Sequence, residues 1–302
     1  MGQWIQIHPP VIVGRLARRL GVIFAAGGRI SAVLGLLLVL IPAVGITSWL
    51  AGVPRTGLLI SDWGEFHGNG PLRPLPMHFS SFLFQMLVVW LTLGGARLIS
   101  RASALREGLE SGNYLTVTKI LDSFPPCEGS RWAKCSDLAA TEATSSGVAA
   151  ILAGGCREVY APLFWSALAG APGAVAYRLV QILAVTWDPA REGWAAARLA
   201  MFVEWLPVRL TALIYVLNSS RLRRSWRYWH HPPLPIPLAA GVSALGLRLR
   251  MPTTEDGPGL VVGEGQPPIP QDVLRAADLV QWGAWLWVAV VVWLGMMRVL
   301  VS

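Results

Sequence analysis

Long apolar runs without charged residues constrain this chain more than any other feature of its sequence. A helix of about 20 apolar residues is long enough to cross the hydrocarbon core of a bilayer. Three runs reach this length, and each predicts a transmembrane helix. They are Ile30–Val53, Pro74–Ala96 (in which His78 is the only ionisable residue) and Leu279–Met297.

The composition supports a membrane protein. Of the 302 residues 54% are hydrophobic and 14% are charged, whereas soluble domains carry about 25% charged residues. The 15 tryptophans fit a chain that meets the membrane interface, where Trp is enriched. The net charge of +8 comes from arginines that separate the apolar runs, so it predicts positive cytoplasmic loops and no nucleic-acid partner.

A fourth apolar segment differs from a plain membrane anchor. Residues 159–177 are uncharged, but they include Pro172, which would open the backbone ladder of a helix. Small residues recur at i, i+4 and i+8, a spacing that lets helices pack closely in lipid. These are Ser166, Gly170 and Ala174. The pattern favours a site-forming element, and it leaves open whether residues 161–187 cross the membrane fully or re-enter.

A fifth segment, Ala195–Leu217, carries three charged residues. A charge at the middle of a bilayer costs about 2.5–3.5 kcal/mol on insertion scales. Arg198 and Arg209 are about 20° from the same face of a straight helix, and Glu204 lies about 120° from Arg198. We expect Pro207 to bend or break the helix.

Two interpretations of these charges stay open. In the first, Arg198 and Arg209 line a cavity for an anionic substrate, and Glu204 pairs with another helix, with Arg178 as the candidate partner. In the second, the helix lies at the membrane interface and its arginines extend toward water.

Together these patterns predict an all-α, polytopic, multi-pass membrane helix bundle with about five spans, with the lipid bilayer as a partner. Residues 98–150 form a cytoplasmic helical segment between the second and third spans, with a turn at Gly112–Asn113. Residues 251–272 read as a loop. We treat residues 1–302 as a single domain.

Common catalytic motifs are absent from the sequence. It contains no Gly-rich phosphate loop, no dinucleotide fingerprint and no zinc-peptidase motif. The three cysteines have no metal spacing and predict reduced thiols. His230 and His231 read as an interfacial pair beside a basic cluster, so we predict no metal site.

Two central motifs resemble those of a known family. "APLFWSALAGAPGAVAYR" at 161–178 and "AAARLAMFVEWLPVRLTALIYVL" at 195–217 are similar to sequences of the CobD/CbiB family of cobalamin-biosynthesis membrane proteins. The flank "HPPVIVGRLARRL" at 8–20 resembles the start of that family more weakly. The resemblance covers most of the chain, in order, and it implies a multi-pass protein of a bacterial inner membrane.

The resemblance implies a reaction, its cofactors and its partners. Members of the family join an aminopropanol, or its phosphate, to a propionate carboxylate of adenosylcobyric acid, and ATP with Mg²⁺ drives the amide bond. A corrinoid is then the substrate, and other cobalamin-biosynthesis proteins are candidate partners. On this basis we expect Glu204 and Asp137 to be catalytic. The expected substrate-binding residues are Arg131, Arg178, Arg198 and Arg209.

The sequence departs from the family at acidic positions. The places of the family's Glu-Asn-x-x-Asp-Gly hold Ala153, Gly154, Arg157 and Glu158. AmpE-type membrane proteins, which are relatives of this family, also lack these acidic residues and share a Trp-x-Pro-Val-Arg-Leu like that at 205–210. A catalytically degenerate, AmpE-like regulatory or assembly protein is therefore the alternative function. A transporter has only the intramembrane charges in its favour.

Overall fold

The computed structural model describes residues 28–50, 95–124, 140–187, 193–217, 236–251 and 260–301. Within these ranges the fold is helical, apart from one short β-hairpin. The helices are α2 (Gly28–Leu50), α4 (Gly95–Glu110), α5 (Tyr114–Leu121), α6 (Ala140–Gly155), the π-helix η2 (Cys156–Tyr160), α7 (Ala161–Thr186), α8 (Trp194–Leu217), α10 (Ile236–Leu245) and α11 (Gln271–Val301).

The chain divides into two compact units. Unit 1 comprises residues 1–92 and 162–205, and unit 2 comprises residues 93–161 and 206–302. Each unit is built from segments that lie far apart in the sequence. The prediction of a single domain over 1–302 stays a prediction.

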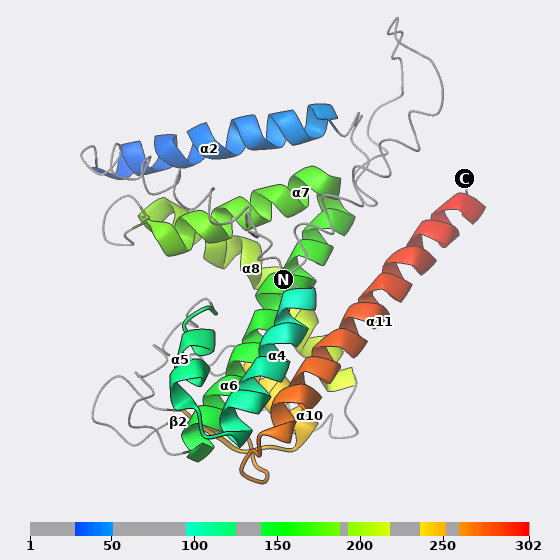
Figure 1. Ribbon diagram of the computed structural model, residues 1–302. Helices are drawn as coiled ribbons and strands as arrows, with labels where there is room; N and C mark the ends of the chain where they lie inside the picture. The colour runs from blue at the N-terminus through cyan, green and yellow to red at the C-terminus, as the bar shows by residue number, and fades with distance from the viewer. Residues whose placement is uncertain are drawn as a thin grey trace, which may run out of the picture. The chain divides into compact units, whose positions relative to one another are not determined.

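Unit 1 packs α2 against α7 and the first part of α8. Leu36 of α2 is buried in one apolar cluster with Leu183 and Trp187 at the end of α7. Ala195 and Ala196 from the start of α8 complete this cluster, and Figure 1 shows α2 running alongside α7. The apolar run predicted as the first span is therefore a helix whose packed face is short, while Ile41 on the same helix is 64% exposed.

Helix α7 is interrupted at Gly170. This glycine has φ 66° and ψ −159°, which lie outside the helical region, and Pro172 follows two residues later. Proline removes one helical hydrogen bond and clashes with the carbonyl four residues earlier, so a break near this point was expected. The break overturns the predicted stripe of Ser166, Gly170 and Ala174, because the three residues do not belong to one regular helix.

Helix α8 contains Pro207 and continues to Leu217, so of the two expected outcomes the break does not occur, while the bend stays a prediction. The hydroxyl of Thr211 donates a hydrogen bond of 2.8 Å to the carbonyl oxygen of Pro207. Side chains of this kind satisfy carbonyl groups within a helix, and the helix persists on both sides of the proline.

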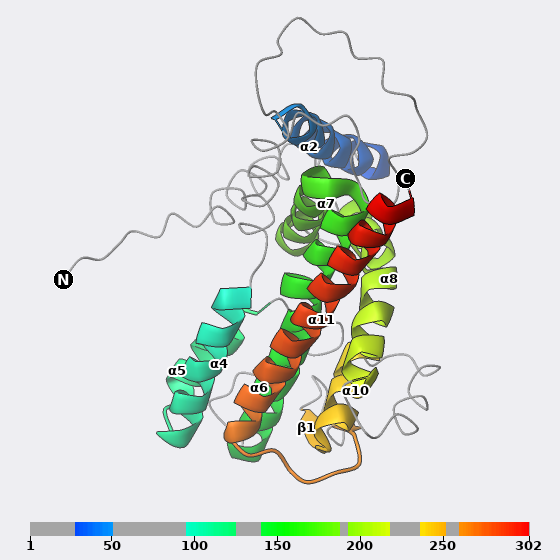
Figure 2. The same ribbon diagram turned by 90° about the vertical axis from the view of Figure 1, so that its right-hand side faces the viewer.

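Unit 2 is organised around α6. This helix packs against α4, α10, α11 and strand β1, and Figure 2 shows α4, α6 and α11 side by side. Most of its side chains are small, which allows close approach of neighbouring helices. Its residues from Ala143 to Leu152 are all buried, and they form the centre of the unit together with Leu105 of α4 and Ala276 of α11.

The turn predicted at Gly112–Asn113 is confirmed. Gly112 has φ 68°, a conformation that glycine adopts without a Cβ clash. Asn113 then caps α5, because its Oδ1 accepts a hydrogen bond of 3.2 Å from the backbone N–H of Thr116. Helix α5 packs back on α4.

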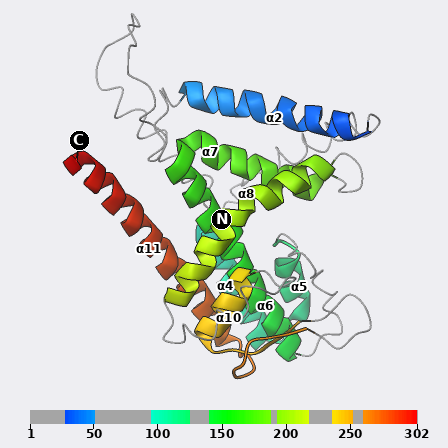
Figure 3. The ribbon, with the colours of Figure 1, turned by 180° about the vertical axis from the view of Figure 1, so that it is seen from behind.

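The region predicted as a loop, 251–272, contains a β-strand and borders on another strand and a helix. Strand β1 (Leu249–Met251) pairs antiparallel with β2 (Leu260–Val262), as Figure 3 shows near α10. Helix α11 begins at Gln271, where Asp272 accepts a hydrogen bond of 2.9 Å from the backbone N–H of Ile269. The loop prediction for 251–272 is therefore wrong at 260–262, which pair with β1, and at the two ends, where β1 ends and α11 begins.

Two helical stretches of the described chain are long and apolar enough to cross a membrane. They are residues 140–186, which run from α6 through η2 to α7, and helix α8. Large apolar side chains on these and other helices are exposed, including Phe202 at 78% and Trp282 at 70%. Such exposed apolar surface marks a membrane or partner contact. The predicted span at 74–96 lies outside the described residues except for its last two positions.

Candidate functional site

The π-helix η2 is the first unusual feature of unit 2. It inserts one wide turn between α6 and α7, and the backbone N–H of Ala161 bonds to the carbonyl oxygen of Cys156 five residues earlier. Short π-helical turns inside α-helices are frequent at functional sites. This turn presents two charged residues, Arg157 and Glu158, at the positions where the resembled family carries its Asp-Gly.

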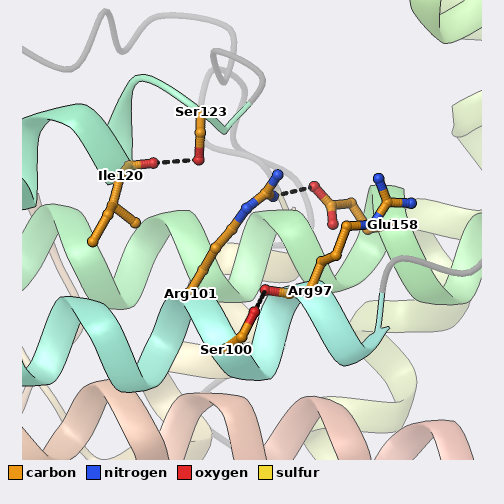
Figure 4. A network of polar contacts seen from close by, with 6 residues as sticks. All are labelled: Arg97, Ser100, Arg101, Ile120, Ser123 and Glu158. Atoms are coloured by element: carbon orange, nitrogen blue, oxygen red, sulfur yellow. Dashed lines mark hydrogen bonds and ion pairs between the residues drawn. The ribbon is translucent and has the colours of Figure 1, made fainter. Parts of the chain in front are cut away.

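An ion pair fixes Glu158 in this turn. Arg101 of α4 donates from Nη1 to Oε1 of Glu158 over 2.8 Å. The two side chains are only 25% and 11% exposed, so water screens this pair weakly. Figure 4 shows Arg101 bonded to Glu158. The Arg101 guanidinium also lies over the ring of Phe124, 4.9 Å from its centre.

Two buried tyrosines, one of them in the same turn, make hydrogen bonds to neighbouring helices. The Tyr160 hydroxyl donates to the carbonyl oxygen of Val280 in α11 over 2.8 Å, and the Tyr215 hydroxyl donates to that of Leu152 over 3.1 Å. Their rings meet edge to face with centres 5.8 Å apart. The buried Cys156 receives a weak contact of 3.5 Å from the Thr211 hydroxyl, so η2 is tied to several helices of unit 2.

The predicted catalytic Glu204 lies in unit 1, on the apolar helix α8. Its Oε1 accepts a hydrogen bond of 2.7 Å from Nε2 of Gln181 on α7. Gln181 lies one helical turn after Arg178 on α7. The expectation that Glu204 contacts another helix is therefore confirmed for α7, with the Gln181 amide as an observed partner. Nearby in the unit, the Trp165 indole donates to the carbonyl oxygen of Val203 over 3.3 Å.

The predicted arginines occupy different environments. Arg178 is half-buried in unit 1. Arg198 is exposed, and its guanidinium lies 5.9 Å from the ring centre of Trp194, a contact that fits the interfacial interpretation of this arginine. Arg209 is half-buried and belongs to unit 2. The roles assigned to these residues stay predictions.

Arg131 and Asp137 lie outside the described residues, as do His230 and His231. Among the residues that the structure does describe, no group of three or more His, Cys, Asp or Glu side chains is placed to hold a metal ion. These residues therefore do not form an all-protein cage for Mg²⁺.

The Arg101–Glu158 pair was not found from the sequence. Its members are 57 residues apart, and no local pattern connects them. The available signal was the lone carboxylate of Glu158 immediately before a long apolar run, since an acidic residue at such a place needs a cationic partner.

Comparisons with known proteins identify the family. A sequence model described as "CobD/Cbib protein" matches residues 1–280. The "Cobalamin biosynthesis protein CobD" of Chromobacterium violaceum is 34% identical over 67% of this chain and 67% of its own length. The protein of the same name from Stutzerimonas stutzeri is 30% identical over 98% of this chain and 93% of its own length.

A third relative, from Mycobacterium tuberculosis, is 26% identical over 90% of this chain and 84% of its own length and carries the same name. No solved structure matches the chain. None of these matches favours the AmpE-like alternative. The chain belongs to the CobD/Cbib protein family, with a role in cobalamin biosynthesis.

Proposed function

We propose that this chain catalyses an ATP-dependent amide coupling in cobalamin biosynthesis, which joins an aminopropanol or its phosphate to a propionate carboxylate of adenosylcobyric acid. One observation carries the proposal. The family match extends over residues 1–280, so it includes both helices, α7 and α8, that place polar side chains inside apolar segments.

Glu204 is the residue to which we assign proton transfer. An amine must lose a proton to attack an activated carboxylate, and a positioned carboxylate can accept it. The hydrogen bond of 2.7 Å from Gln181 fixes one oxygen of Glu204, and the surrounding segment is apolar. A carboxylate retained in such a segment is costly, which supports a functional role.

The arginines are assigned to the anionic groups of the substrates. Guanidinium groups suit carboxylate and phosphate because they donate two parallel hydrogen bonds. Arg178 and Arg209 are half-buried, which strengthens such contacts. Arg198 is exposed and would contact substrate at the edge of the binding site. Arg131 and Asp137 would contribute side chains to the site from the segment 98–150.

ATP and Mg²⁺ belong to this proposal as co-substrate and metal. The described residues do not form a metal cage, and Mg²⁺ in nucleotide-dependent enzymes is often bound mainly by phosphates. We therefore assign no step to a metal held by the protein alone. The setting is a bacterial inner membrane crossed about five times, with other cobalamin-biosynthesis proteins as partners.

A complementation experiment tests the proposal in cells. A bacterium that lacks its own CobD-type protein but takes up corrinoid precursors is supplied with this chain, and growth is followed under conditions that require cobalamin. We expect growth without added cobinamide. Glu110→Gln, on the surface of α4, should grow equally well, whereas an inserted and stable protein that fails to support growth would contradict the proposal.

A further inference from the structure

We propose that Trp165 is a positioning residue for Glu204, because its indole N–H bonds to the backbone carbonyl that Pro207 leaves without a helical donor. The inference rests on the catalytic role proposed for Glu204, and it adds a residue that acts on Glu204 through the main chain. Trp165, Val203 and Glu204 belong to unit 1, and Pro207 follows on the same helix, α8.

Pro207 removes one hydrogen bond from the backbone of α8. In an α-helix the N–H of residue 207 would donate to the carbonyl oxygen of Val203, four residues earlier. Proline has no N–H, and its ring crowds that carbonyl group. Helix α8 nevertheless continues through Pro207 to Leu217, so the Val203 carbonyl needs another donor. Helix α8 is long and apolar enough to cross a membrane, and lipid cannot supply that donor.

Trp165 on α7 supplies a donor for this carbonyl. Its Nε1 donates to the carbonyl oxygen of Val203 over 3.3 Å. Neighbouring helices are one of the means by which membrane proteins satisfy the backbone groups that a proline frees. The carbonyl belongs to the peptide group that joins Val203 to Glu204. The bond from Trp165 therefore fixes the main chain directly before the proposed catalytic carboxylate.

The two parts of α7 converge on these adjacent residues of α8. Gln181 donates from Nε2 to Oε1 of Glu204 over 2.7 Å, while Trp165 bonds to Val203. In a straight α-helix Trp165 and Gln181 would lie about 24 Å apart along the axis, too far for both side chains to reach adjacent residues. The break at Gly170 lies between them, and Figure 1 shows α7 changing direction. The break therefore lets one helix hold both the side chain and the main chain of Glu204.

Trp165 is itself held in place. A Cβ built at Gly173 would lie 2.5 Å from the carbonyl oxygen of Trp165, whereas these residues would be about 12 Å apart along an unbroken helix. The Trp165 ring also meets the Phe164 ring edge to face, with centres 5.3 Å apart. Little freedom of Trp165 therefore remains to be lost when its indole bonds to α8.

The first experiment asks whether the effect of the indole N–H depends on Pro207. Amide formation is measured in purified membranes, per amount of inserted protein, for the unchanged chain, Trp165→Phe, Pro207→Ala and the double variant. We expect Trp165→Phe to lower kcat about tenfold or more, within the range for a slightly misplaced catalytic group. KM should stay unchanged, because the indole is assigned no contact with substrate.

Pro207→Ala restores the N–H at position 207, so the Val203 carbonyl regains its helical donor. In that background Trp165→Phe should change kcat by less than about twofold, because two changes that act on one carbonyl are not additive. A tryptophan that only fills space would cause the same loss in both backgrounds.

Two controls separate the missing N–H from the smaller ring. β-(3-Benzothienyl)alanine placed at position 165 keeps the bicyclic shape and has sulfur where the indole carries its N–H, so it should match Trp165→Phe. Trp282→Phe is the matched substitution on α11, where Trp282 is 70% exposed, and it should leave kcat unchanged.

A second measurement does not depend on the proposed reaction. The full chain with ¹⁵N-labelled tryptophan in nanodiscs gives indole N–H signals, and the signal of Trp165 is the one lost in Trp165→Phe. Pro207→Ala gives the Val203 carbonyl a competing donor. The Trp165 indole proton should then move upfield and exchange faster with deuterium, whereas Trp282→Phe should leave this signal in place.

The outcomes distinguish this inference from the proposed function. If the unchanged protein forms no amide, the proposed function fails, while a Trp165 signal that responds to Pro207→Ala still supports the bond to Val203. If the protein is active, equal kcat losses from Trp165→Phe in both backgrounds, or no loss, overturn the positioning role and leave the function standing. A Trp165 signal that ignores Pro207→Ala overturns the inference in either case.

Discussion

Two carboxylates lie in or beside long apolar segments of this protein, and their partners differ. Glu158 in unit 2 accepts a hydrogen bond from the Arg101 guanidinium at 2.8 Å, whereas Glu204 in unit 1 accepts one from the Gln181 amide at 2.7 Å. The first side chain is 11% exposed and sits in a π-helix tied to several helices. The second lies on a helix with much exposed apolar surface.

This difference indicates that the Glu158 and Glu204 carboxylates have different roles. A guanidinium bonded to a carboxylate neutralises its charge, which suits a structural role. The Gln181 amide fixes one oxygen of Glu204 in place, and a positioned carboxylate can accept a proton. The following predictions test these two roles and the packing of the two units, from the largest expected effect to the smallest.

Replacing Glu204 with Gln should reduce amide formation by a factor of about 10²–10⁴, the range for loss of a general base. Gln keeps the shape of the side chain and can still bond to Gln181, so membrane insertion should be unchanged. Product is measured by mass spectrometry in purified membranes. Glu110→Gln, on the surface of α4, is the control, and equal activity of the two variants would remove Glu204 from the catalytic assignment.

The Arg101–Glu158 pair should be a stability determinant of unit 2. Arg101→Ala leaves a mostly buried carboxylate without this partner, and we expect a loss of about 1.5–3 kcal/mol in the free energy of unfolding. Chemical denaturation in detergent gives this value. The double variant Arg101→Ala with Glu158→Ala should lose less than the two single variants added together, and strict additivity would show that the pair contributes nothing.

The break in α7 should make unit 1 intolerant of a methyl group at Gly173. A Cβ built there lies 2.5 Å from the backbone carbonyl oxygen of Trp165, and main chain cannot move aside as a side chain can. We expect Gly173→Ala to lower stability by about 1–3 kcal/mol.

Gly147→Ala in α6 is the matched substitution in unit 2, because its nearest neighbour would be at an ordinary 3.6 Å. Alanine favours helix over glycine by about 1 kcal/mol, so this variant should be neutral or stabilising. If both alanine variants behave alike in thermal unfolding, the close approach at Gly173 is not a constraint.

The smallest effect is expected at the tyrosines of unit 2. Tyr215→Phe removes one hydroxyl, whose bond to the Leu152 carbonyl spans 3.1 Å, and keeps the ring contact with Tyr160. A neutral hydrogen bond contributes about 1 kcal/mol, so the thermal midpoint should fall slightly and amide formation should be unaffected. A large loss of activity would bring this hydroxyl into the chemistry.

Much of the helical organisation could be predicted from apolar length. The segments expected at 30–53 and 195–217 are helices at 28–50 and 194–217, because apolar runs of this length have few other stable arrangements in lipid. The turn at Gly112–Asn113 was predictable because glycine supplies the positive φ and asparagine caps the next helix.

The remaining features depend on interactions that single positions do not reveal. The π-helix at Cys156–Tyr160 has no composition of its own, since it differs from an α-helix by one hydrogen-bond step. The Arg101–Glu158 pair joins distant segments, and the hairpin of β1 and β2 pairs stretches of only three residues. The position of Glu204 on an apolar helix could be read from the sequence, but its amide partner Gln181 could not.

The most direct test of the central claim is amide formation by the unchanged protein. Purified membranes receive adenosylcobyric acid, aminopropanol phosphate, Mg²⁺ and ATP, and the cobinamide product is followed by mass against membranes without the protein. The account predicts product that requires all four additions and the protein. Absence of product from protein shown to be inserted and folded would contradict it.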